Sequence, residues 1–523
     1  MTISIPFGRA VATAIAAGGV VTVLASSAAA ATYEVGPGQQ YQSLEQVRDL
    51  VGPGDVIELQ GDAAYSGDLK LKKSGTAGAK ITVRGVRKNG KRPVIRGGDQ
   101  GIKVMGSHYV LEGLEITGSA RSCLVHSGND LTVRDTVVHD CPKHGILGTD
   151  TESGSLTLDH VEVYRAGSGL KYHSIYIATD EKAYPGSVFR MQHSYVHDVN
   201  GGNAVKSRAE RNEIYYNWVE SAEYHVLELI GSEEFPAGVV REDSDVVGNV
   251  LRKTGGGPAI RLGGDGSGDS FGRFRLVNNT VVLAPGASSV LRLFEGIESV
   301  EVTNNVFYQT GGAPIAKLMR SKEAKWSLGH AKISGRNNWI PEGSGEVPTT
   351  WTATIYGDDP GFADAKGLNL VPTSGSALCD AGTAPGNAGD APIPHPLAAP
   401  SASPPPRALL KLGTSMQRPQ SGRLDIGAYE RGTHAPARNV AEDVREAGQA
   451  LVAEVSAEAA EEMGAEMDAD TDTDSDMDDA AEGFACSAVR GRRVGSGAGV
   501  VSALGLASLS ARRRRRRARR AGR

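Results

Sequence analysis

Short apolar segments that alternate with polar positions recur along the first two thirds of the chain. Val205 and Leu227 are apolar, and each is followed by a charged residue, Lys206 and Glu228. This period of two, interrupted by polar turns, predicts short β-strands. The same unit can be superposed along the chain, and its inward residues are then Ile102, Leu124, Ile146, Ile175, Val205, Leu227, Ile260 and Leu291.

The spacing of these units predicts the fold. The first two steps are 22 residues each, and later steps are 29, 30, 22, 33 and 31 residues. A step near 22 residues with loop insertions is typical of one coil of a parallel β-helix. We therefore expect an all-β, single-stranded right-handed parallel β-helix, a solenoid, with Leu44, Val47 and Leu50 or Val51 forming a short helix at its open end.

Asparagines mark the second strand of the unit. Stacked asparagine amides can each donate and accept a hydrogen bond along the coil axis, so we expect a ladder at an internal turn. Its members are Asn217, Asn249, Asn279, Asn305 and Asn338, and an upstream series at the same corner would be Asp135, His160 and His193.

The ends of the chain differ from the repeats. Residues 1–31 place an apolar run after Arg9 and end in alanines, which is typical of a secretory signal peptide. Residues 32–340 carry the coil pattern, and residues 341–431 are expected to close the coil by packing on its last turns. Residues 432–485 are rich in Ala, Glu and Asp, which predicts a disordered acidic spacer.

Composition adds little beyond this. The 523 residues include 67 Gly and 9 Phe, which suits many turns, and the net charge is −5. Four cysteines do not make a disulfide framework. One coil earlier, Cys141 would lie over Ser119, four residues before Cys123, and this offset argues against a Cys123–Cys141 bridge.

Residues 486–523 have an ordered arrangement of their own. Cys486 and Ser487 are followed by a Gly/Ala/Ser/Val/Leu stretch and then by the arginine cluster at 512–520. This order resembles the C-terminal sorting tails of myxobacterial surface proteins. The resemblance implies processing near Cys486 by a sorting protease, membrane contact only through the tail, and retention at the cell surface or outer membrane. Export makes nucleic acid an improbable partner for the arginines.

The predicted register places polar side chains in two rows on one face. The outward row is Leu147, Tyr176, Lys206, Glu228, Arg261 and Arg292, and the second row is His144, His173, Asn203, His225 and Pro258. Basic residues at coil spacing suit an anionic chain such as a polyuronate. Candidate substrate contacts are Arg208, Arg261, Arg292 and the sugar-stacking residue Trp218.

The segment VKSRAERNEIYYN at 205–217 is similar to the lysine-containing turn of β-helical lyases of the alginate lyase and chondroitinase B type. In that family a Lys-Ser pair precedes an Asn, an Ile and another Asn, and the matching residues here are Lys206, Ser207, Asn212, Ile214 and Asn217. The resemblance implies Lys206 as the base of a β-elimination and a calcium ion on the uronate carboxylate. The family's arginine one coil later falls at Glu228, so Glu228 and Glu210 are the candidate calcium ligands.

Several alternatives stay open at this point. Without calcium, Glu228 would favour protonated Lys206, and His173 or His225 would be the better base, with Tyr176 as the acid. The first hypothesis is a monomeric surface lyase or epimerase acting on an anionic glycan. The second is a non-catalytic rod that binds glycans, as an adhesin or coat component.

Overall fold

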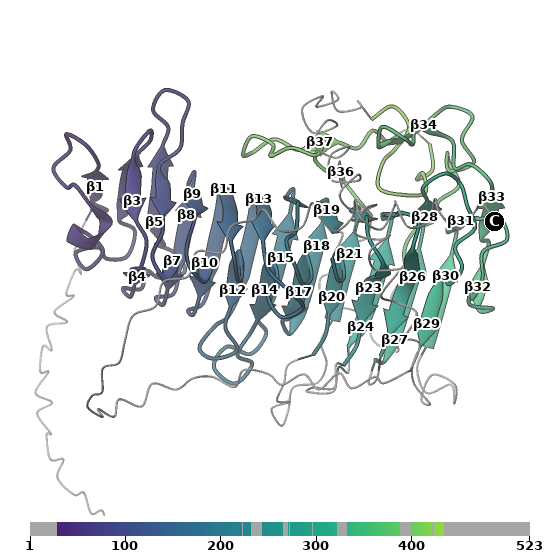
Figure 1. Cartoon of the computed structure of the whole chain (residues 1–523), viewed down its shortest axis with the longest axis horizontal. Coiled ribbons are helices and arrows are strands. Elements are labelled where there is room, and N and C mark those ends of the chain that lie inside the picture. Colours follow the sequence, from purple (N-terminus) through teal and green to yellow (C-terminus); the bar gives the residue numbers. More distant parts are fainter. Residues whose placement is uncertain are drawn as a thin grey trace, which may run out of the picture. The chain divides into compact units, whose positions relative to one another are not determined.

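The computed structural model describes residues 29–221, 223–231, 243–264, 270, 272–294, 297–321, 332–386, 399–420 and 422–433. Most of the described part is a parallel β-helix whose coils contribute strands to three stacks (Figure 1). The predicted signal peptide lies almost wholly outside these ranges, as do the acidic spacer, Cys486 and the arginine cluster. Within the described ranges, no helix is long and apolar enough to cross a membrane.

The first stack is a ten-stranded parallel sheet that carries the repeat seen in the sequence. Its register pairs Ile175 with Val205 and Val205 with Leu227, so the predicted inward column is confirmed. All eight predicted inward residues are buried in one core. The strands are β4 (Leu69–Leu71), β7 (Gln100–Val104), β10 (Ser122–His126), β12 (Ile146–Gly148), β14 (Ile175–Ala178), β17 (Val205–Arg208), β20 (Leu227–Leu229), β23 (Gly257–Leu262), β26 (Ala287–Leu293) and β29 (Met319–Ser321).

The other two stacks meet at a sharp corner and together form a 23-stranded sheet. The stack before the corner comprises β1 (Thr32–Val35), β2 (Val56–Gln60), β5 (Ile81–Val86), β8 (Tyr109–Glu112), β11 (Leu131–Cys141), β13 (Leu156–Ala166), β15 (Val188–Gln192), β18 (Arg211–Tyr215), β21 (Asp243–Val247), β24 (Arg273–Val277), β27 (Ser299–Thr303), β30 (Lys332–Arg336) and β32 (Trp351–Thr352). The stack after the corner comprises β3 (Ala64–Ser66), β6 (Val94–Arg96), β9 (Glu115–Thr117), β16 (Tyr195–His197), β19 (Trp218–Ser221), β22 (Val250–Lys253), β25 (Thr280–Leu283), β28 (Val306–Gln309), β31 (Trp339–Pro341) and β33 (Ile355–Gly357). The long strands β11 and β13 run through the corner and belong to both stacks.

The asparagine ladder is present at this corner. The amide Nδ2 of Asn217 donates to Asn249 Oδ1 at 3.0 Å, and the same contact continues from Asn249 through Asn279 and Asn305 to Asn338. Each amide also donates to a backbone carbonyl of the preceding coil, as Asn249 does to Ile214 at 2.8 Å. Buried amides that satisfy one another in this way fix the stacking of successive coils.

The upstream series was assigned one position too early. Gln192 pairs with Tyr215, so His193 aligns with Tyr216, and it is Ser194 that aligns with Asn217. Asp135, His160 and His193 all have positive φ, between 45° and 56°, as does Tyr216 at 55°. These residues therefore form the left-handed position of the corner, which Asn and Asp adopt more easily than most residues.

The prediction that Cys123 and Cys141 are not bridged was wrong. Cys123 and Cys141 form a disulfide with their Cα atoms 5.8 Å apart. The register was correct, because Cys141 extends the pairing of His139 with Thr117 and so lies over Ser119. However, the chain turns between β9 and β10, and this turn brings Cys123 close to Cys141 at the end of β11.

The open end of the coil carries a single turn of 3₁₀ helix, η1 (Leu44–Gln46), in place of the longer helix expected. Ser43 and Gln46 cap it reciprocally. Leu44, Val47 and Val51 are buried in the core, whereas Leu50 is exposed, so the chain still covers the first coil with apolar side chains.

The coil continues past residue 340, because β32 and β33 still pair with β30 and β31. The chain then forms two small hairpins, β34 (Phe362–Asp364) with β35 (Asn369–Pro372) and β36 (Ala402–Ser403) with β37 (Met416–Gln417). Apolar residues of this closing segment, including Leu370, Leu378 and Tyr429, pack on the outer side of the post-corner stack against Trp218 and Trp339.

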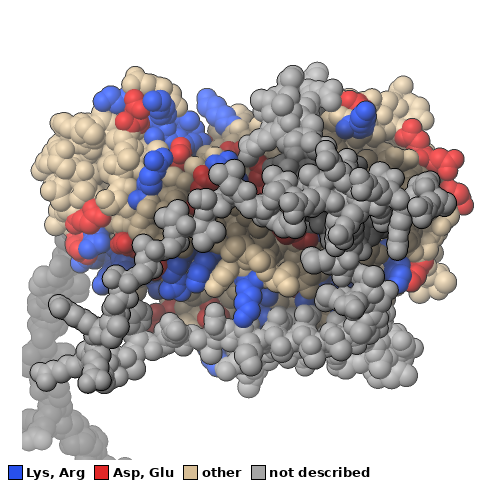
Figure 2. Space-filling view, in the orientation of Figure 1, with Lys and Arg blue, Asp and Glu red and all other residues tan. Residues whose placement is uncertain are grey.

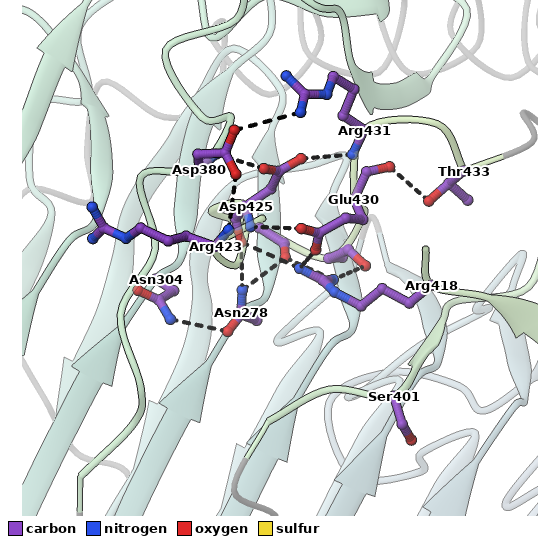
Figure 3. Close-up of polar contacts among 12 residues, drawn as sticks. Asn278, Asn304, Asp380, Ser401, Arg418, Arg423, Asp425, Glu430, Arg431 and Thr433 are labelled. Carbon is purple, nitrogen blue, oxygen red and sulfur yellow. Dashed lines mark hydrogen bonds and ion pairs between the residues drawn. The ribbon is translucent and has the colours of Figure 1, made fainter. Parts of the chain in front are cut away.

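Polar contacts fix the closing segment to the corner. Asn278 Nδ2 donates to the carbonyl of Asp425 at 2.8 Å, and Asn304 Nδ2 donates to Asn278 Oδ1 at 3.1 Å (Figure 3). Buried Arg418 forms an ion pair with Glu430 at 2.9 Å inside the segment (Figure 3). The segment therefore covers the later coils of this stack.

Candidate functional site

The predicted outward row is present in the ten-stranded sheet. Tyr176 pairs with Lys206, Lys206 with Glu228, and Glu228 with Arg261, in the predicted order. Arg261 in turn pairs with Arg292. The structure thus brings five of the candidate residues onto consecutive coils, about 4.8 Å apart along the axis.

Lys206 lies at the surface of this row. Its Nζ is 5.1 Å from the ring centroid of Tyr176 and 3.9 Å from Glu228 Oε2. The Lys206 side chain remains 14% exposed, whereas the Glu228 side chain is 2% exposed. A substrate approaching the row would therefore meet Lys206 before Glu228.

Glu228 is a buried anion held by several donors. Arg261 Nη1 contacts its Oε1 at 3.0 Å, and Asn203 Nδ2 donates to its Oε2. Burial by itself would raise the pKa of Glu228, but the positive charges of Lys206 and Arg261 lower it to about 2. Glu228 is therefore ionised at neutral pH and stabilises the ammonium form of Lys206.

The second row is joined by hydrogen bonds between coils. The backbone N–H of His173 donates to His144 Nδ1 at 3.1 Å, and the backbone N–H of Asn203 donates to His173 Nδ1 at 2.9 Å. Since Nδ1 of each ring accepts a hydrogen bond, the neutral rings of His144 and His173 carry their proton on Nε2. His173 can therefore donate a hydrogen bond from Nε2, and neither of its ring nitrogens has a free lone pair with which to accept a proton.

His225 has the opposite tautomer. Asn203 Oδ1 accepts from the backbone N–H of His225 at 2.9 Å and lies 3.1 Å from its Nδ1. The Asn203 amide cannot be reversed, because its Nδ2 faces the Glu228 carboxylate. His225 Nδ1 must then carry the proton, and Nε2 is an unprotonated nitrogen that is buried without a hydrogen-bond partner among the described residues.

Burial keeps these imidazoles neutral. Desolvation lowers the pKa of His225 to about 3 and that of His144 to about 4. It also lowers the pKa of His173 well below 6.5, and the charge of Lys206 contributes to this shift. Neutral histidines in this row act as hydrogen-bond donors and acceptors at neutral pH.

The remaining predicted substrate contacts differ in exposure. Arg292 is partly exposed, and its guanidinium lies 4.6 Å from the ring centroid of Phe294. Arg208 is 1% exposed and donates to the carbonyl of Gly231 at 3.0 Å. The prediction of Trp218 as a sugar-stacking residue does not fit the structure, because Trp218 is buried beneath the closing segment and donates to Glu220 at 2.6 Å.

The two predicted calcium ligands lie in different surroundings. Glu210 Oε2 accepts from the backbone N–H of Gly186 at 2.6 Å, while Glu228 contacts Lys206 and Arg261. Calcium prefers six to eight oxygen ligands, and a carboxylate already neutralised by two cations is a poor donor for it. Within the described ranges, no three His, Cys, Asp or Glu residues are grouped so as to hold a metal. The donor set around Glu228 therefore does not fit calcium.

Two buried polar residues near the site were not singled out from the sequence. Asn203 links His173, His225 and Glu228, and its position in the second row was the available signal. Lys253 is buried, its Nζ donates to the carbonyl of Glu223 at 2.6 Å, and desolvation lowers its pKa to about 8. The alternation of β22 predicts an inward side chain at position 253, and a lysine at such a position is the sequence signal for this residue.

Comparisons with known proteins give similarity at the level of whole structures. No protein-family model matches the chain, and no curated protein sequence matches it. The pectate lyase Pel9A matches with a TM-score of 0.47 and 14% identity, over 77% of this chain and 96% of that one. An alginate lyase from Paenibacillus sp. str. FPU-7 matches with a TM-score of 0.32 and 14% identity, over 62% and 99% of the two chains.

A lacto-N-biosidase from Eubacterium ramulus matches with a TM-score of 0.39 and 13% identity, over 59% of this chain and 67% of that one. These overall similarities are low. The strand pairings described above show the parallel β-helix.

Proposed function

We propose that this protein acts on an anionic, uronate-containing polysaccharide by β-elimination, or by epimerisation through the same first proton abstraction. The observation that carries the proposal is the position of Lys206. It lies partly exposed between the ring of Tyr176 and a buried anion, with Arg261 and Arg292 on the next coils. Arg292 is partly exposed and can meet a carboxylate of the chain, whereas Arg261 is buried against Glu228 and acts only through its charge.

The proposed reaction needs a base, an acid and compensation of the carboxylate charge. The base removes the proton α to the uronate carboxylate, the electron pair forms a carbon–carbon double bond, and the glycosidic oxygen leaves with a proton. In the epimerase variant the carbanion is instead reprotonated on the opposite face. We assign the base to Lys206 and the acid to the Tyr176 hydroxyl, while arginines offset the developing charge.

The tautomers support Lys206 over the histidines as the base. The proton of neutral His173 is on Nε2, and its Nδ1 is occupied by the backbone of Asn203. His225 has an unprotonated Nε2, but the residue is completely buried. Of the three candidate bases, Lys206 has the side chain that a substrate can reach. To act as the base it must lose its proton although the negative charge of Glu228 favours the protonated form.

A second candidate function is a non-catalytic glycan-binding or structural surface protein. This function is favoured because the charge of Glu228 is already neutralised by ion pairs with Lys206 and Arg261. Such a charge ladder can stabilise a stack of coils without any chemistry.

The experiment that separates these functions exposes the purified full chain to alginate, pectate and glycosaminoglycans in deuterated buffer. Elimination would give an unsaturated uronate seen by ultraviolet absorbance. Epimerisation would give deuterium at the α-carbon without unsaturation. Binding without either product on any of these polymers would reject the enzymatic proposal and support the second candidate.

We also propose that the protein is exported and retained at the cell surface through the region of Cys486. The Cys123–Cys141 disulfide supports the export alone, since such bonds persist mainly in oxidising compartments. A Cys486→Ala variant should be released into the medium or stay unprocessed. Unchanged processing and retention of this variant would contradict the proposal.

A further inference from the structure

A cavity of about 570 Å³ lies on the post-corner stack of the first coils, on a different sheet from Lys206. Its floor is one column of paired residues on five consecutive coils. The register runs from Ala64 to Val94, Glu115, Val137 and Glu162. From Val94 onward the floor therefore alternates valines with carboxylates.

Both carboxylates are oriented by histidines of the neighbouring column. Glu115 Oε1 lies 3.2 Å from His139 Nε2, and Glu162 Oε1 lies 3.3 Å from His197 Nε2. The ring of Tyr164, which lines the cavity, is stacked between these two imidazoles at 4.8 and 5.1 Å. The same arrangement thus occurs twice, two coils apart, on a rigid aromatic stack.

The second nitrogen of each histidine also contacts a carboxylate. His139 Nδ1 lies 2.7 Å from Asp140, and His197 Nδ1 lies 3.3 Å from Asp198. Desolvation would lower the pKa of His197, but Asp198 and Glu162 outweigh it and raise the pKa to about 9. The raised pKa keeps the His197 ring charged beside Glu162, and the side chains of Glu115 and Glu162 remain 30% and 21% exposed.

Basic residues of the β5–β6 loop form the rim. Arg87 and Arg92 pair with Asp135, and Lys91 pairs with Asp62 at 2.9 Å. The lining residues include three acids and three bases, so the lining carries no net formal charge. Figure 2 shows the same mixture, with Lys, Arg, Asp and Glu side chains close together over the first coils.

The same floor column continues under the closing segment. Glu162 pairs with Tyr195, Tyr195 with Trp218, and Trp218 with Val250. There the column is apolar, and the chain itself covers it with residues such as Leu370 and Tyr429. On the first coils the column instead carries two carboxylates among its apolar side chains and lines an open cavity, which suits a hydroxylated ligand in place of the protein's own apolar side chains.

We propose that this cavity binds a neutral oligosaccharide segment that runs along the coil axis. Two oriented carboxylates accept hydrogen bonds from sugar hydroxyls, and the arginine and lysine of the rim donate to ring and hydroxyl oxygens. Val137, which lies between the carboxylates, and the apolar residues on the coils before Glu115 contact the C–H faces of the sugar. The coil spacing of about 4.8 Å is close to the length of one sugar unit. The balanced lining disfavours an anionic chain, and the inference stands independently of any reaction at Lys206.

The test is isothermal titration of the full chain with short oligosaccharides from cellulose, xylan and galactan, and with oligogalacturonate as the anionic arm. We expect at least one neutral oligosaccharide to bind. Its affinity should fall tenfold or more in the double variant Glu115→Gln and Glu162→Gln, because two charge-assisted hydrogen bonds become neutral ones. Circular dichroism and the melting temperature check that the variant is folded.

A matched control is Glu58→Gln, which changes a carboxylate of similar exposure, 29%, on the adjacent stack and outside the cavity. This variant should bind like the wild type. Absence of binding by all three neutral probes, equal binding by the double variant, or preferential binding of oligogalacturonate that depends on Glu115 and Glu162 would each overturn the proposal.

Discussion

Asn203 Oδ1 lies 3.1 Å from Nδ1 of His225 and accepts the backbone N–H of the same residue at 2.9 Å. This contact sets the proton of His225 on Nδ1, whereas the backbone of Asn203 sets the proton of His173 on Nε2. Two buried histidines of one row are thus held as opposite tautomers by a single residue. The same residue holds Glu228, the counter-ion of Lys206.

The first prediction concerns these tautomers. Nitrogen and carbon NMR shifts of the imidazoles should show an Nδ1–H ring for His225 and an Nε2–H ring for His173. Asn203→Ala should shift His225 toward Nε2–H, and Asn203→Asp should keep Nδ1–H because it retains the acceptor. An Nε2–H ring at His225 in the wild type would contradict the assignment, as would an unchanged ring in Asn203→Ala.

The second prediction concerns Glu228→Gln. Loss of the carboxylate leaves Arg261 buried without its counter-ion, and we expect the free energy of unfolding to fall by about 3–5 kcal/mol. Glu112→Gln, which removes a half-buried partner of Arg134, should cost about 1 kcal/mol or less. Equal losses in urea unfolding of the two variants would argue against a buried pair.

The same carboxylate predicts an acid limit. The folded pKa of Glu228, about 2, is lower than its ordinary value of 4.5. Its stabilising contribution is therefore complete above pH 4.5 and is lost as the pH falls toward 2. Stability measured across this range should fall less in Glu228→Gln than in the wild type.

The pairing of Glu228 with Lys206 and Arg261 also predicts that calcium does not stabilise the protein through this residue. If calcium raises the melting temperature of the wild type but not of Glu228→Gln, this pairing is wrong.

The third prediction concerns the asparagine ladder. Asn249 accepts from the backbone N–H and amide of Asn217 and donates to Ile214 and Asn279. Asn249→Ala leaves several buried groups unsatisfied, each costing about 1–3 kcal/mol. We expect a loss of at least about 2 kcal/mol in thermal or urea unfolding. A smaller loss than in Asn338→Ala, which removes the last member of the ladder, would contradict this.

The fourth prediction concerns His197. Its folded pKa of about 9 is higher than the ordinary 6.5, so its stabilising contribution is complete below pH 6.5 and disappears as the pH rises through 9. The shift corresponds to an effect on the order of 3 kcal/mol. His197→Gln should remove this slope from a pH series of unfolding measurements. Parallel slopes in the variant and the wild type would rule out a charged His197.

The coil and its register follow from local patterning. Alternation with a period of two fixes which side chains point inward, and one slip would turn Val205 outward, so the predicted column of Ile175, Val205 and Leu227 matches the structure. The asparagine ladder was likewise visible because each member occupies the same local context.

Contacts that depend on corners or on distant segments were not visible in the sequence. The turn between Ser119 and Cys123 allows a disulfide that an extended strand would forbid. Trp218 is covered by residues about 150 to 210 positions later in the chain, and no local pattern records this. The role of Asn203 depends on the directions of its hydrogen bonds, which only a structure gives.

The most direct test of the central claim is the turnover of uronate polysaccharides by Lys206→Ala. The matched control is Lys103→Ala, which removes a lysine from the same outward row of the sheet at β7, four coils before Lys206. If Lys206 is the base, the wild type and Lys103→Ala will form unsaturated or epimerised uronate, while Lys206→Ala will form neither and will keep its β-sheet far-ultraviolet spectrum. Wild-type turnover by Lys206→Ala would contradict the assignment.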